Sequence, residues 1–167
     1  MSTWSVTEVS FLDRGAFLLA FGEVYEDSPH LADAAFESAP FADLDDLVRS
    51  FHDAAEALDD DARMALLRAH PQLGARRPMA DASVAEQRSA GLDRMEDDVA
   101  RRLAAGNADY AWRHGFPFII AVRGRSQEEI LAELERRLPR PTEEEAAEAF
   151  AQVQAIAELR IRQLVSP

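Results

Sequence analysis

The chain has 167 residues, a length that fits one compact domain with its own core. Hydrophobic residues make up 47% and charged residues 29%, which is globular usage and too apolar for a disordered chain. The net charge of -13 leaves no basic face for DNA, RNA or an anionic membrane, so we expect none of these as partners.

Apolar residues at three- and four-residue steps predict four helices in the N-terminal part of the chain. Asp13 is placed to cap the first helix, and Ser28-Pro29 begins the second. Pro71 ends the fourth, which leaves His70 at a helix end. We expect these helices over residues 13–25, 30–38, 44–58 and 59–69.

The middle of the chain is less regular. Residues 72–82 contain glycine and proline without a helical period, which predicts a loop of the kind that often carries binding groups. A short helix is expected over 83–91. Residues 92–114 indicate two helical pieces, with an interruption at Gly106-Asn107.

The C-terminal part opens on an unusual apolar run. Residues 115–122 contain a proline and are too short for an ordinary helix, so we expect a buried extended segment. Ser126–Glu129 and Thr142–Glu145 both match the capping box that begins a helix. These boxes predict helices over 127–138 and 143–164.

Together these elements predict an all-α protein, a single-domain irregular multi-helix bundle over residues 1–167. The sequence has no internal repeat, low-complexity tract or linker. Its N-terminus does not match a signal segment, and no apolar run approaches the roughly 18 residues of a membrane span. We therefore expect a cytoplasmic protein.

The residue inventory excludes several kinds of chemistry. There is no cysteine, which excludes thiolate nucleophiles and Cys-ligated metal sites. All 18 basic residues are arginine, which excludes a Schiff base on a lysine. The histidines lack the spacing of a zinc motif, so we expect no metal. The glycines lack the spacing of a nucleotide-binding loop.

Four histidines are candidates for proton transfer, because histidine changes charge near neutral pH. His30 and His52 lie on amphipathic helices as ordinary surface histidines, and His114 ends a helix, where the dipole favours a cation. His70 precedes proline and opens the irregular loop, which fits either catalysis or a buried helix end. Ser83-Val-Ala-Glu86 matches a capping box, and on spacing alone a cap is the simpler interpretation.

Five patches, taken in order, carry a resemblance to a known family. They are Val24-Tyr-Glu-Asp-Ser-Pro29, Leu67-Arg-Ala-His-Pro-Gln-Leu-Gly74, Ser83-Val-Ala-Glu-Gln87 with Ala90-Gly-Leu92, Asn107-Ala-Asp-Tyr110, and Gly115-Phe-Pro-Phe-Ile-Ile-Ala-Val-Arg-Gly-Arg-Ser126. Together they resemble the 2-oxo-4-hydroxy-4-carboxy-5-ureidoimidazoline (OHCU) decarboxylase family from about Val6 to Leu164. The sequence departs from the family pattern in a short loop between Gly74 and Ser83, and in His114, where an aromatic residue is common.

The resemblance implies an all-α enzyme of urate degradation that removes carbon dioxide from a small ureidoimidazoline and yields (S)-allantoin. It implies that His70 is the general acid/base and that Glu86 orients ring or ureido N–H groups. The conjugated C=N of the substrate accepts the electrons, so no cofactor is required. The substrate contacts that the resemblance implies are Pro71, Ser83, Gln87, the backbone of Phe118, Ile119, Ile120, Ala121 and Val122, and Arg160 for a carboxylate or ureido oxygen.

Two alternatives remain open at the level of sequence. One is a non-enzymatic helical interaction module in which His70 and Glu86 are structural and the acidic surface recruits a partner. The other is a hydrolase or isomerase of a related ureide, because one fold can host different chemistries. Oligomeric state is open, with a homodimer as the candidate assembly.

Overall fold

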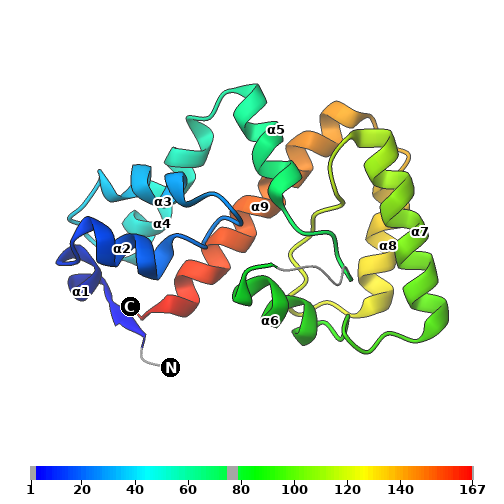
Figure 1. Ribbon diagram of the computed structural model, residues 1–167, viewed down its shortest axis with the longest axis horizontal. Coiled ribbons are helices and arrows are strands. Elements are labelled where there is room, and N and C mark those ends of the chain that lie inside the picture. The colour runs from blue at the N-terminus through cyan, green and yellow to red at the C-terminus, as the bar shows by residue number, and fades with distance from the viewer. Residues whose placement is uncertain (1–2, 75–78, 167) are drawn as a thin grey trace. The chain divides into compact units, whose positions relative to one another are not determined.

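The computed structural model describes residues 3–74 and 79–166, and most of this part of the chain is helical (Figure 1). This confirms the predicted all-α class. Among the described residues, no helix combines the length and apolar character needed to cross a membrane. The elements in these ranges are β1 (Trp4–Ser5), α1 (Val6–Ser10), α2 (Arg14–Phe21), α3 (Pro29–Phe36), α4 (Leu44–Glu56), α5 (Asp60–Ala69), α6 (Asp81–Ser89), α7 (Asp97–His114), α8 (Gln127–Arg137), α9 (Thr142–Leu164) and β2 (Val165–Ser166).

The chain divides into two compact units, the first formed by residues 1–66 and 154–167. Aromatic rings occupy its core. The ring centroid of Phe17 lies 4.8 Å from that of Phe21 and 6.0 Å from that of Phe51, and all three side chains are fully buried. The two short strands pair in parallel within this unit. Packing of large aromatic side chains therefore holds its helices together.

The second unit is formed by residues 67–153. It contains α6, α7, α8 and an irregular segment over 115–126. Gly115 ends α7 in the left-handed conformation, at φ 80°, which glycine adopts without steric cost. Most of the apolar residues that follow are buried and none is helical, as the sequence predicted.

Helix α7 runs without a break, so the predicted interruption at Gly106-Asn107 is wrong. Gly106 lies against α8, where an added Cβ would come within 2.6 Å of Leu134 Cδ2. Asn107 is buried, and its Nδ2 donates to the backbone oxygen of Leu73 at 3.0 Å. Both residues serve packing, which overrides their low intrinsic preference for a helix.

Six predicted helices match α3, α4, α5, α6, α8 and α9 to within two residues at each end. Other boundaries differ. α2 ends at Phe21 rather than at residue 25, and α1 and the strands had not been predicted. The predicted loop over 72–82 lies partly outside the described residues, and its last two residues already belong to α6.

The capping predictions have mixed outcomes. Ser126 Oγ accepts the N–H of Glu129 at 3.2 Å, and Glu129 Oε2 accepts that of Ser126 at 2.7 Å, which confirms this box. Ser83 is not a cap, because α6 begins at Asp81 with Ala80 as its N-cap. The box at Thr142–Glu145 is also wrong, because the side chain of Glu145 enters a buried ionic cluster.

Candidate functional site

His70 lies directly after α5 in the second unit and is only 8% exposed. Its backbone N–H donates to the oxygen of Leu67 at 3.3 Å, and Pro71 stops the helix from continuing. His70 lines a cavity of about 340 Å³, a volume in the range of small-molecule sites. The other lining residues are Arg68, Gln72, Ala111, Gly115, Phe116 and Pro117.

Arg68 places a cation at the same cavity, and the sequence had not singled it out. Its Nε donates to the backbone oxygen of Gly115 at 3.0 Å, which holds the guanidinium beside the start of the apolar segment. The available signal was its position, two residues before His70 at the end of one helix. An imidazole and a guanidinium at one cavity can transfer a proton and hold an anion.

The α6 residues selected from the sequence have different surroundings. Ser83 is buried at 2% exposure, and Glu86 is half-buried and lines neither of the cavities described here. Gln87 lines a second cavity of about 620 Å³, where its Oε1 accepts the N–H of Gly74 at 2.8 Å. The structure therefore assigns His70 and Gln87 to the walls of two different cavities.

The extended segment follows immediately on the His70 cavity, because Phe116 and Pro117 line that cavity. Phe118, Ile119, Ile120 and Val122 are buried and Ala121 is half-buried. Protein side chains already bind part of its backbone. The oxygen of Ile119 accepts from Arg137, and the N–H of Ala121 donates to Gln152.

Arg160 belongs to the first unit and is 3% exposed. Its Nη1 donates to the backbone oxygens of Glu23 and Val24, both at 3.2 Å. The same nitrogen lies 3.6 Å from Glu26 Oε2. Arg160 is therefore held by protein groups of its own unit at this nitrogen.

The remaining histidines lie on the surface or contact other groups of the protein. His30 is exposed, and His52 Nε2 lies 3.3 Å from the backbone oxygen of Gln154. His114 is buried, with Nε2 3.1 Å from the oxygen of Leu138 and Nδ1 2.9 Å from Thr142 Oγ1. Burial lowers the pKa of His114 and outweighs the opposite effect of the Leu138 carbonyl. This histidine fastens the α8–α9 turn to α7.

Within residues 3–74 and 79–166, no three His, Asp or Glu side chains converge as they do around a metal ion. The imidazole of His70 is the histidine side chain in the walls of the two cavities described here.

Comparison with known proteins gives a consistent result. The OHCU decarboxylase family model matches residues 10–162. The chain is 39% identical over 166 residues to 2-oxo-4-hydroxy-4-carboxy-5-ureidoimidazoline decarboxylase of Haloferax volcanii, and the match covers 99% of each protein.

Two solved structures share the fold. The crystal structure of (S)-allantoin synthase matches with a TM-score of 0.80 at 24% identity, over 96% of this chain and 54% of that chain. The crystal structure of OHCU decarboxylase in the presence of (S)-allantoin matches with a TM-score of 0.73 at 25% identity, over 87% of this chain and 96% of that chain. This chain belongs to the OHCU decarboxylase family.

Proposed function

We propose that this protein decarboxylates 2-oxo-4-hydroxy-4-carboxy-5-ureidoimidazoline to (S)-allantoin without a cofactor, with His70 as general acid/base. The observation that carries the proposal is the position of His70. It is a buried imidazole in the wall of a cavity of about 340 Å³, in a chain whose full length matches a named decarboxylase of this substrate.

The chemistry needs little beyond this cavity. When the C–C bond to the carboxylate breaks, its electron pair moves toward the conjugated C=N of the substrate, and carbon dioxide leaves. The enol left behind must then gain a proton on the ring carbon that bears the ureido group, from one face, which fixes the handedness of the product, while its hydroxyl group loses a proton and becomes a carbonyl. A positioned imidazole can supply that proton, an effect worth about 10²–10⁴-fold.

The surrounding residues would orient the substrate. The guanidinium of Arg68 lines the cavity and can attract the substrate carboxylate. Pro71 shapes the chain after His70, and Ser83, Glu86 and Gln87 on α6, with the Phe118–Val122 backbone, are the further contacts that we propose. We propose Arg160 as a further carboxylate or ureido ligand.

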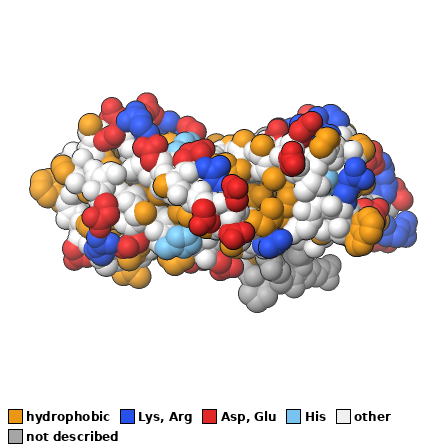
Figure 2. All heavy atoms as spheres, turned by 90° about the horizontal axis from the view of Figure 1, so that it is seen from above, with side chains coloured by type: hydrophobic (Ala, Val, Ile, Leu, Met, Phe, Trp, Pro, Cys, Tyr) orange, Lys and Arg blue, Asp and Glu red, His pale blue; other side chains and the backbone are white. Residues whose placement is uncertain are grey.

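We also propose that the protein works in the cytoplasm, as a homodimer, on a small molecule rather than on nucleic acid or a membrane. The charge supports the absence of a nucleic-acid or membrane partner, since acidic residues number 31 and basic residues 18. On the face shown in Figure 2, basic side chains lie interspersed with acidic and apolar ones and form no broad patch. Such a surface does not attract a polyanion.

The test uses freshly generated ureidoimidazoline, followed by its disappearance and by chiral chromatography of the allantoin. The protein is expected to accelerate the loss of substrate and to yield one enantiomer. His70→Asn should reduce kcat by about 10²–10⁴-fold, because the proton donor is lost. His30→Asn is the matched control, since His30 is exposed on α3, and it should keep full activity.

The outcomes separate the candidate functions. Racemic allantoin formed at the uncatalysed rate with wild-type protein would overturn the decarboxylase proposal. If the His70→Asn variant is folded and fully active, the proposed reaction stands but His70 is not its general acid/base. Glu86→Gln tests the second residue, and we expect mainly a higher KM because the amide retains shape but loses the charge that orients N–H donors.

A further inference from the structure

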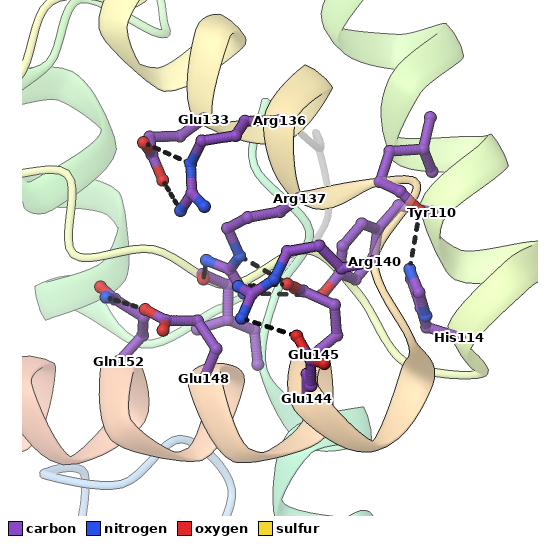
Figure 3. A network of polar contacts seen from close by, with 12 residues as sticks. Tyr110, His114, Glu133, Arg136, Arg137, Arg140, Glu144, Glu145, Glu148 and Gln152 are labelled. Carbon is purple, nitrogen blue, oxygen red and sulfur yellow. Dashed lines mark hydrogen bonds and ion pairs between the residues drawn. The ribbon is translucent and has the colours of Figure 1, made fainter.

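Arg137 is a fully buried arginine that the proposed reaction does not use. It comes from the last turn of α8, and its side chain lies among groups from three other segments of the second unit (Figure 3). Its Nε lies 2.8 Å from Glu145 Oε2, an equally buried carboxylate. Its Nη1 donates to the backbone oxygen of Ile119, also at 2.8 Å.

Stability alone does not explain this ion pair. Taking two charges out of water is costly, and apolar residues of similar volume often replace a buried pair without loss of stability. What an apolar residue cannot do is donate hydrogen bonds in fixed directions from a rigid planar group. The guanidinium does this for Ile119, and its Cζ lies 4.8 Å from the centre of the Phe118 ring. Arg137 therefore fixes two consecutive residues of the segment proposed to contact substrate.

The carboxylate of Glu145 holds Arg137 in place. Tyr110 Oη donates to Glu145 Oε2, and Arg140 Nη1 donates to Glu145 Oε1 at 2.8 Å. Burial, helped by the hydrogen bond to Glu145, raises the pKa of the Tyr110 phenol, so that it stays a neutral donor. With both carboxylate oxygens bound, Glu145 cannot rotate away from the guanidinium.

Gln152 on α9 fixes the segment at a second point, two residues further on. Its Oε1 accepts the N–H of Ala121 at 2.9 Å, while its Nε2 donates to Glu148 Oε1 at 2.9 Å, which sets the orientation of the amide. Arg125 Nε donates to the oxygen of Ala121 at 3.1 Å. Side chains of the protein therefore bind the backbone of residues 119 and 121.

Ile120 lies between these two fixed points. In an extended chain, the backbone groups of successive residues point to opposite sides. The N–H and C=O of Ile120 therefore point away from the side to which the bound groups of Ile119 and Ala121 point. Ile120 is 3% exposed, and among the described residues we find no hydrogen bond to its N–H or C=O. Buried backbone groups of this kind normally have a partner, which a ligand can provide.

We propose that Arg137 and Gln152 are positioning residues that set the register of the Phe118–Val122 segment, so that Ile120 presents its peptide groups to the substrate. This inference rests on the proposed function. It assigns to two residues outside the described cavities a part in binding, through the backbone that they hold.

The test compares Arg137→Met and Gln152→Met with Arg136→Met in the decarboxylation assay. Arg136 is the matched control, because it is the preceding residue of the same helix and pairs with Glu133 on the surface. In Arg137→Met, Glu145 keeps Arg140 and Tyr110, so the carboxylate is not left without partners. Circular dichroism should confirm that each variant is folded at the assay temperature.

We expect both positioning variants to lower kcat/KM by about 10–100-fold, since small misplacements of a bound substrate have effects of this size. The loss should appear as a higher KM and a lower enantiomeric excess, while the pH dependence of kcat stays that of wild type. Arg137→Lys should recover only part of the loss, because an ammonium lacks the planar fork. Arg136→Met should behave as wild type.

Folded variants with the KM and enantiomeric excess of wild type would overturn this inference and leave the proposed function standing. Wild-type protein without activity would overturn the proposed function and the inference together. Should Arg137→Met fail to fold, Gln152→Met decides, because its half-exposed side chain can be replaced with little effect on the core.

Discussion

Arg160 and Glu26 form a buried ion pair within the first unit, with 3.6 Å between Nη1 and Oε2. Their side chains are 3% and 4% exposed. The arginine that the family resemblance selects for the substrate carboxylate thus already has a carboxylate partner in the protein. Any part that it plays in binding is added to a structural one.

Arg160→Met is expected to destabilise the protein by about 3–5 kcal/mol, because it removes a cation from a buried carboxylate. Urea unfolding followed by circular dichroism measures this. Arg162→Met is the matched control, two residues later on the same helix, where the arginine pairs on the surface with Asp45 and Glu158. Its effect should stay below about 1 kcal/mol. Equal losses of stability in the two variants would show that the buried ion pair contributes no more than the surface pairs.

Gly106→Ala is expected to destabilise the protein by about 1–2 kcal/mol, although alanine is the better helix former. The added methyl would lie 2.6 Å from Cδ2 of Leu134, a buried side chain that is 1% exposed and would have to shift. Thermal unfolding measures the change.

Gly15→Ala provides the comparison for Gly106→Ala. Gly15 lies in the first turn of α2, where the nearest atom to an added Cβ is Asp13 Oδ1 at 3.4 Å. Here alanine should raise stability by about 0.4–1 kcal/mol, by restricting the unfolded chain. A stabilising Gly106→Ala would contradict the close packing of α7 on α8.

His114 should make stability depend on pH in the weakly acidic range. Its pKa in the folded protein is below the ordinary value of 6.5, chiefly because of burial. Below that value the unfolded chain binds a proton that the folded chain resists. Stability present above about pH 6.5 is therefore lost as the pH falls through the lowered pKa.

Urea unfolding of wild type and His114→Gln between pH 8 and pH 5 isolates this effect. The difference in stability between the two proteins should shrink toward acid, since glutamine does not titrate. A difference that stays constant with pH would mean that His114 titrates alike in both states.

The sequence predicted those parts of the fold that depend on local periodicity. The apolar stripes of α4 and α5 and the capping residues of α8 act over three or four positions, and their limits were found to within two residues. It failed where a distant contact decides. Gly106 interrupts nothing because Leu134, on another helix, fits against it. Glu145 has the spacing of a cap but is bound by Arg137, which only tertiary packing brings near.

The candidate site shows the same division. His70 was a candidate because proline and an irregular loop follow it in the sequence, the family resemblance selected it, and the structure places it at a cavity. Arg68 escaped notice because an arginine near a helix end is common, and its bond to the oxygen of Gly115 spans 47 residues. The family resemblance also selected Glu86 and Gln87. Their roles, like the expectation of a single domain, stay predictions.

Arg137 has a consequence for how the second unit opens in solution. It binds Tyr110 of α7, Ile119 of the irregular segment and Glu145 of α9 at the same time. Breaking any one of these contacts alone would leave a buried charge or donor without its partner. Unfolding of all the contacting segments together therefore costs the least free energy. The amide protons of α7, α8 and the first turns of α9 should therefore exchange with deuterium as one cooperative group, at a common free energy of opening.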